Sequence, residues 1–136
     1  MYKTPQEIRL ACRNKIHCDQ TAGHAPGYAQ ANLCILPAQY AFDFLLFCQR
    51  NPKTCPLLHV LEEDVYQLED IDIRTDLPKY RIFINGEFQV VDDIKDHWRN
   101  DFVTFIIGCS FSFEDAMIKA GLPVRQIEQG DRTVPM

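Results

Sequence analysis

The stretch FVTFIIGCSFSFEDAMIKAGLPVR, residues 102–125, decides the fold of this chain. It opens with an apolar run that ends before Gly108, which is typical of a buried strand. A cysteine and two serines follow, and a helical pattern begins at once and is closed by Gly121. Ser112 stands three residues before Asp115 and is placed to cap that helix. The chain therefore turns from a buried strand into a helix at a point where reactive side chains collect.

Upstream of this stretch, strand and helix patterns alternate. Residues 33–36 and 57–60 are short apolar runs that predict buried strands. Between them, residues 37–50 form a helical pattern that is apolar on nearly all sides, which predicts a helix in the middle of the protein. A capping box with proline at the first helical position predicts a first helix over residues 5–15.

Asn85-Gly86 stands between two alternating runs in YRIFINGEFQVV. A type I′ turn needs positive φ at both central residues, so this pattern predicts a β-hairpin at about residues 80–91. A short helix is expected over residues 93–98. These elements together predict an α/β (or α+β) fold, in which helices flank a mixed β-sheet. The length of 136 residues suits one domain, residues 1–136.

The charge balance argues against nucleic acid as a partner. The chain has 14 basic and 19 acidic residues and a net charge of -5, whereas phosphate backbones select basic surfaces. No apolar run reaches the ~20 residues that a bilayer span needs, and the N-terminus is a charged helical pattern. We expect a soluble cytoplasmic protein without membrane contact, or one of the mitochondrial matrix in a eukaryote. The six cysteines are expected to be reduced thiols.

Cys109 follows a strand and precedes a helix, where backbone amides favour an anion and lower a thiol pKa. It is therefore a candidate nucleophile for a cysteine-dependent acyl-transfer enzyme, which would need a histidine brought close by folding. The alternative is a buried structural thiol. Ser110 and Ser112 are candidate ligand contacts, with helix capping as the alternative.

A cluster of soft ligands, Cys12, His17, Cys18 and His24, fits no zinc-finger spacing, and no metal site is expected. Arg50 and Arg74 stand just beyond apolar elements. Guanidinium groups so placed suit bidentate carboxylate binding, and surface salt bridges are the alternative.

Five stretches together closely resemble the D-glutamate cyclase family, also described as YcsI-like hydro-lyases. The resemblance runs from the first helix almost to Met136 and keeps the order of the motifs, as in the N-terminal half of a family member. The five stretches are AGHAPGYAQANL (22–33), FLLFCQRNPKTCPLL (44–58), DIRTDLPKYR (72–81), GCSFSFEDA (108–116) and AGLPVRQIEQG (120–130).

The resemblance implies a lyase that acts on a small acidic amino acid without metal or organic cofactor, by reversible dehydration of D-glutamate to 5-oxo-D-proline. One alternative is a non-catalytic small-anion-binding or truncated domain of the same family, and another is the cysteine-dependent enzyme. Half of a family fold would leave apolar surface uncovered. We therefore expect a homo-oligomer or association with the C-terminal half.

For this reaction we expect separated loops to converge on one pocket. The 108–112 turn would hold the developing oxyanion through its amides. The candidate catalytic residues are Asp76, Glu114 and Ser110. The candidate substrate-binding residues are Arg74, Arg50, Asn32, Gln30, Tyr28, Cys109 and Ser112.

Overall fold

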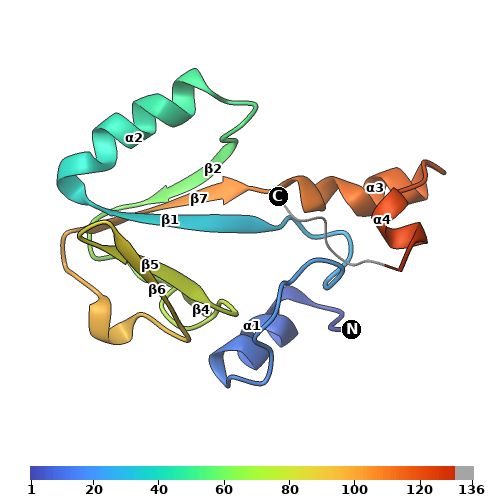
Figure 1. Ribbon diagram of the computed structural model, residues 1–136, viewed down its shortest axis with the longest axis horizontal. Coiled ribbons are helices and arrows are strands. Elements are labelled where there is room, and N and C mark those ends of the chain that lie inside the picture. The colour runs from blue at the N-terminus through green and yellow to red at the C-terminus, as the bar shows by residue number, and fades with distance from the viewer. Residues whose placement is uncertain (131–136) are drawn as a thin grey trace.

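The computed structural model describes residues 1–130 (Figure 1). The helical elements are α1 (Pro5–Arg13), α2 (Ala38–Arg50), η1 (Lys95–His97), η2 (Ser110–Phe113), α3 (Glu114–Lys119) and α4 (Arg125–Glu128). The strands are β1 (Ala31–Pro37), β2 (Leu57–Leu61), β3 (Gln67–Leu68), β4 (Ile71–Asp72), β5 (Tyr80–Ile84), β6 (Glu87–Val91) and β7 (Phe102–Gly108). No helix within residues 1–130 combines the length and apolar character that crossing a bilayer requires.

The central sheet has the strand order β1-β7-β2, and β7 pairs antiparallel with both neighbours. β1 and β2 therefore run in the same direction, but β7 lies between them. The predicted combination of sheet and helices is confirmed. Each bonded pair in the described residues is antiparallel, so the fold is of the α+β kind and the central sheet is antiparallel, without the parallel pairing of a mixed sheet.

α2 covers one face of this sheet. The ring of Phe44 meets that of Phe105 edge to face, with the centroids 4.8 Å apart, and Phe105 is only 1% exposed. The opposite side of the helix faces solvent, because α2 lies at the outer edge of the molecule (Figure 1). Tyr40, Phe42 and Phe47 are each more than half exposed. The prediction that this helix lies in the middle of the protein is therefore wrong for residues 1–130, where only one of its faces has a sheet to pack on.

The first helix begins as predicted. The Thr4 hydroxyl accepts a hydrogen bond from the Glu7 amide at 3.2 Å, and the Glu7 carboxylate accepts the Thr4 amide at 3.2 Å. These two bonds satisfy amides that the first turn of a helix leaves open. Ile8, Ala11 and Cys12 form the buried side of α1.

The hairpin is confirmed as β5 and β6. Asn85 has φ 52° and Gly86 has φ 84°, the left-handed values that a type I′ turn requires. Phe83 faces Phe88 across the two strands, and Tyr80 faces Val91. Tyr80 at the base is buried, but every residue from Phe83 to Val90 is exposed.

The junction after β7 differs from its prediction. The turn η2 begins at Ser110 with Cys109 as its cap residue, and α3 begins with Phe113 as its cap residue; neither helix has a side-chain cap. Ser112 lies inside η2, so its hydroxyl is not placed to cap a helix start, and it bonds to Gln30 instead. The predicted end of the helix is correct, because Gly121 follows α3 with φ 74°.

Candidate functional site

Two open clefts meet at the loop before β1. The larger, here the central cleft, has a volume of about 820 Å³ and lies between α1, residues 18–33 and residues 68–79. The smaller, here the loop cleft, has a volume of about 420 Å³ and lies between residues 23–30 and the η2-α3 segment. Both are lined by His24, Ala25, Tyr28, Gln30 and Phe111. The loop is therefore the common wall of the two clefts.

Gln30 fixes this loop to the turn after β7. Its amide donates to the Ser112 hydroxyl at 2.8 Å, and that hydroxyl donates to the Gln30 carbonyl at 3.2 Å. The Cys109 amide donates to the same carbonyl at 3.1 Å. Within the loop, the Gln30 side chain accepts a hydrogen bond from the Thr21 hydroxyl and donates one to the Thr21 carbonyl. Two segments far apart in sequence are thus held as one rigid wall.

Several of the predicted site residues come together on these clefts. Tyr28 lines both of them and is 56% exposed. The central cleft is lined by Tyr28, Gln30, Asn32, Asp76 and Cys109. The loop cleft is lined by Tyr28, Gln30, Ser112 and Glu114. Three predicted residues, Arg50, Arg74 and Ser110, line neither cleft.

Asn32 lies at the border of the central cleft. It pairs with Ile107, and two residues further on Cys34 pairs with Phe105. Because residues two apart in a strand share a face, the Asn32 side chain belongs to the sheet face that α2 covers. Leu33 and Ile106, a facing pair on the other side of the sheet, line the central cleft.

Arg74 has a partner within its own loop. Its guanidinium donates to both carboxylate oxygens of Asp72, at 3.0 and 2.8 Å, and it lies 3.5 Å from the centre of the Tyr66 ring. The hydrogen bonds from this guanidinium lower the pKa of Asp72. Of the two alternatives for this arginine, the geometry favours the salt bridge. Arg50 is exposed at the end of α2.

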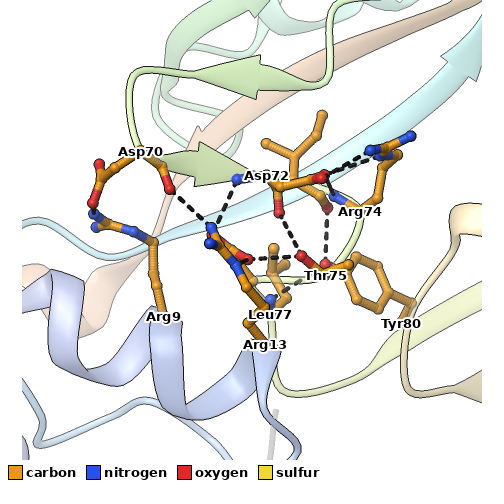
Figure 2. Close-up of polar contacts among 10 residues, drawn as sticks. Arg9, Arg13, Asp70, Asp72, Arg74, Thr75, Leu77 and Tyr80 are labelled. Carbon is orange, nitrogen blue, oxygen red and sulfur yellow. Dashed lines mark hydrogen bonds and ion pairs between the residues drawn. The ribbon is translucent and has the colours of Figure 1, made fainter.

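Asp76 ties α1 to the following segment. Arg13 donates to its two carboxylate oxygens at 2.7 and 2.6 Å, the Thr75 hydroxyl donates at 2.8 Å, and the Asp72 amide at 3.0 Å. Figure 2 shows Arg9 and Arg13 extending from α1 toward Asp70 and the loop that carries Arg74.

The Asp76 side chain is fully buried. Burial favours a higher pKa, but the bonds from Arg13, Thr75 and the Asp72 amide together hold the pKa of Asp76 below its ordinary value. A carboxylate with both oxygens bonded and a lowered pKa is poorly suited to the proton transfer predicted for it. The geometry favours a structural role.

The turn after β7 has little of its backbone free. The Gly108 amide donates to the Pro56 carbonyl at 2.9 Å, and the Ser112 amide to the Cys109 carbonyl at 3.2 Å. The Cys109 amide is held by Gln30, so the predicted oxyanion contact would fall to the amides of Ser110 and Phe111. The Cys109 side chain is partly buried in the wall of the central cleft, where His24 also lies.

The histidines and cysteines near the N-terminus pack as a cluster. The rings of His17 and His24 lie 5.0 Å apart, and the Tyr2 amide donates to Nδ1 of His24 at 3.1 Å. Cys12 is buried, which raises the pKa of its thiol to about 11. Within residues 1–130, no three His, Cys, Asp or Glu side chains are grouped so that they could hold a metal ion.

Known proteins match almost the whole chain. The profile of the family described as D-glutamate cyclase matches residues 103–136. "Putative hydro-lyase OB3382" of Oceanobacillus iheyensis is 56% identical over 135 residues, which cover 97% of this chain and 53% of the relative. A "Putative hydro-lyase" of Aliivibrio fischeri is 50% identical over 130 residues, which cover 92% of this chain and 49% of the relative.

The chain is similar to the D-glutamate cyclase family over residues 103–136 and to proteins named as putative hydro-lyases over nearly its whole length. This confirms the resemblance found in the sequence. The chain spans about half the length of the curated relatives that it matches. Two of the stretches that carried the resemblance, 22–33 and 108–116, are the segments that Gln30 joins. A third, 72–81, contains Asp76, which pairs with Arg13 of α1.

The sequence prediction missed the cations that do line the central cleft, Arg9 and Lys79. Arg9 stands one helical turn before Arg13, so both extend from the same side of α1, and that spacing was a usable signal. The Arg9 Nη2 donates to both Asp70 oxygens at 3.2 and 3.1 Å. Its Nε is buried and has no partner among the described residues. Lys79 pairs with Asp92.

Proposed function

We propose that this chain forms part of the active site of a hydro-lyase that acts on a small acidic amino acid. One observation carries the proposal: the 22–33 loop and the 108–116 turn form a shared, hydrogen-bonded wall of two clefts. Relatives at 50–56% identity are named as hydro-lyases, which supports the reaction class. We assign the reaction as reversible dehydration of D-glutamate to 5-oxo-D-proline.

In this reaction a C–N bond forms between the α-amine and the carbon of the γ-carboxyl group (Cδ), and one C–O bond of that carboxyl group breaks. The ammonium nitrogen gives up two protons, which leave with the departing oxygen as water. The protein must hold the α-carboxylate and fold the substrate back on itself, since orientation alone can supply effective molarities of ~10⁵ M or more. Proton transfer to the leaving oxygen needs a general acid.

We place the carboxylate anchor at Arg9, in place of Arg74 and Arg50. A buried donor without a partner costs about 1–3 kcal/mol, and a substrate carboxylate in the central cleft would satisfy the Arg9 Nε. Arg9 keeps its Nη2 on Asp70 at 3.1 Å, which fixes the orientation of the guanidinium.

The other contacts come from the shared wall. The Tyr28 phenol faces both clefts and is placed to bind the substrate. The amide of Phe111, a residue that lines both clefts, is assigned to the developing oxyanion, and Glu114, on the loop cleft, is assigned to proton transfer. Further groups are expected from the half of the family fold that this chain does not match.

The reaction is tested by incubating D- and L-glutamate with this chain and with a fusion that continues it into the unmatched half of the Oceanobacillus relative. We expect 5-oxoproline from D-glutamate with the fusion. If neither protein forms 5-oxoproline from either enantiomer while both are folded, the assignment is wrong. A fusion without turnover that binds D-glutamate would favour a non-catalytic, small-anion-binding domain.

Arg9→Ala in the fusion should raise the KM for D-glutamate at least tenfold, since a hydrogen bond to a charged group contributes about 1.5–3 kcal/mol. Asp70→Asn is the matched control, because it removes the charge of Asp70 but keeps a side-chain oxygen that can accept from the Arg9 Nη2 and hold the guanidinium. We expect its KM to change much less. Cys109→Ala should keep turnover, and a folded but inactive Cys109→Ala would favour the cysteine-dependent alternative.

An unchanged KM in Arg9→Ala would show that the substrate carboxylate binds elsewhere. Lys79, the other cation on the central cleft, would then be the next position to vary.

A further inference from the structure

The β5-β6 hairpin exposes large apolar side chains, although it has only two strands. Phe83 is 67% exposed, Ile84 55%, Phe88 58% and Val90 55%. The two strands form a separate two-stranded sheet, so each has one edge without a strand partner in the described residues. Isolated two-stranded hairpins are marginally stable in water. The hairpin therefore has both apolar surface and backbone edge to offer to another segment.

Three of these side chains share one face with Arg81. Phe83 pairs with Phe88, and Arg81 pairs with Val90, two positions along the same ladder. The Phe83 and Phe88 rings lie 5.6 Å apart, and the Arg81 guanidinium lies 4.9 Å from the centre of the Phe88 ring. We call Arg81, Phe83, Phe88 and Val90 the hairpin patch. Aromatic side chains together with an arginine are the composition that protein interfaces favour.

The relatives indicate what covers this patch. They match this chain over about half of their length, so about half of each relative has no counterpart in it. We propose that the hairpin patch binds that other half of the family fold, through an apolar segment that brings a carboxylate to Arg81. Arg81 makes no ion pair with residues 1–130, so its charge is available for such a contact.

The outer face of α2 is the competing surface. Its Phe42 is 68% exposed, as much as Phe83. However, a helix satisfies its backbone hydrogen bonds internally, whereas a hairpin edge leaves amides and carbonyls for a neighbour. The hairpin patch is therefore the surface that gains more from being covered.

Amide hydrogen exchange tests the proposal without any need for turnover, so its outcome is independent of the proposed reaction. Exchange of residues 83–90 is compared between this chain and the fusion that carries the unmatched half of the Oceanobacillus relative. We expect these amides to exchange at least tenfold more slowly in the fusion. Phe88→Asp in the fusion should restore fast exchange, and Phe42→Asp, on an equally exposed phenylalanine, should leave the protection in place.

Equal exchange rates in the two proteins would overturn the proposal. Slow exchange in this chain alone that depends on its concentration would show that a second copy covers the patch. Protection that is lost in Phe42→Asp and kept in Phe88→Asp would assign the contact to α2. If the fusion does not fold, the unmatched half is co-expressed as a separate chain, and failure of the pair to protect residues 83–90 also counts against the proposal.

Discussion

The segment from Ile71 to Tyr80 and the hairpin from Arg81 to Val91 are adjacent in sequence and opposite in environment. In the first, charged side chains are turned inward and paired, as Asp76 is with Arg13. In the second, aromatic side chains are turned outward, as Phe83 and Phe88 are. Whether a side chain is charged or apolar therefore does not by itself determine whether it is buried or exposed.

The difference lies in what each segment contacts. The first segment contacts α1 through the ion pair of Asp76 with Arg13. Arg9 and Arg13 also bond to Asp70, directly before the segment (Figure 2). Tyr80 closes it, because its hydroxyl donates to the Ile73 carbonyl at 2.8 Å and accepts the Leu77 amide at 3.2 Å. Beyond Tyr80, every residue of the hairpin from Phe83 to Val90 is exposed. Substitutions should therefore act very differently on the two sides of Tyr80.

The largest effect is expected at Asp76. Asp76→Asn should lower the free energy of unfolding by about 3 kcal/mol, since removing one partner of a buried pair costs 3–5 kcal/mol and Arg13 is partly exposed. Urea unfolding at pH 7 gives the change from the midpoint and slope. Asp96→Asn, on an exposed residue of η1, is the matched control. A loss below about 1 kcal/mol, the usual range of an exposed pair, would show that Asp76 does not hold α1.

A smaller effect is expected from acid. The folded state lowers the pKa of Asp76 and Asp72 below their unfolded values, which are about 3.9. Their contribution to stability is thus fully present above the unfolded pKa and is lost as pH falls through the folded pKa. The free energy of unfolding should be level from pH 7 to 5 and fall below pH 4.

The same pH series on Asp76→Asn should show a shallower fall. Asp92→Asn should keep the full slope, because the Lys79 and Asp92 side chains are 44% and 52% exposed and their pair is screened by solvent. Identical slopes in the wild-type chain and Asp76→Asn would contradict the role assigned to Asp76.

The smallest effect is expected on the hairpin patch. Phe83→Thr in this chain should change the free energy of unfolding by no more than about 0.5 kcal/mol, as substitutions of exposed surface residues usually do. The same substitution in the fusion should cost more, because there the ring is expected to be covered. A large loss in the chain alone would mean that Phe83 already packs on a neighbour, which would remove the contrast with Asp76.

The sequence predicted the elements that depend on neighbouring residues. The capping box at Thr4 and Glu7 and the turn at Asn85-Gly86 formed as expected because each is closed by residues within a few positions. The strand at 102–108 was recognisable from its apolar run. The ion pair of Arg74 with Asp72 could also have been predicted from the sequence, because the two residues are only two positions apart.

The features that the sequence did not predict depend on contacts between residues that are far apart in the chain. Ser112 bonds to Gln30, 82 positions away, and Arg13 to Asp76, 63 positions away. The sequence had suggested Gln30 and Ser112 as substrate contacts and Asp76 as a catalytic residue. The apolar pattern of α2 likewise showed that its sides suit burial, but not whether a neighbour exists on each side. Several candidate site residues lie together around Gln30 and Tyr28, while the sequence suggested Arg74 and Arg50, and not Arg9, as the cation for a substrate carboxylate.

The position of β7 has a consequence for biosynthesis. Ala31 pairs with Gly108, and β1 and β2 touch only through this strand. During synthesis, β1 and β2 leave the ribosome long before β7, which pairs with both of them. Until β7 is made, the backbone edges of β1 and β2 lack this strand partner. Such long-range pairing slows folding and leaves a nascent chain prone to aggregation. Chaperone dependence should therefore concentrate in the interval between synthesis of β2 and of β7.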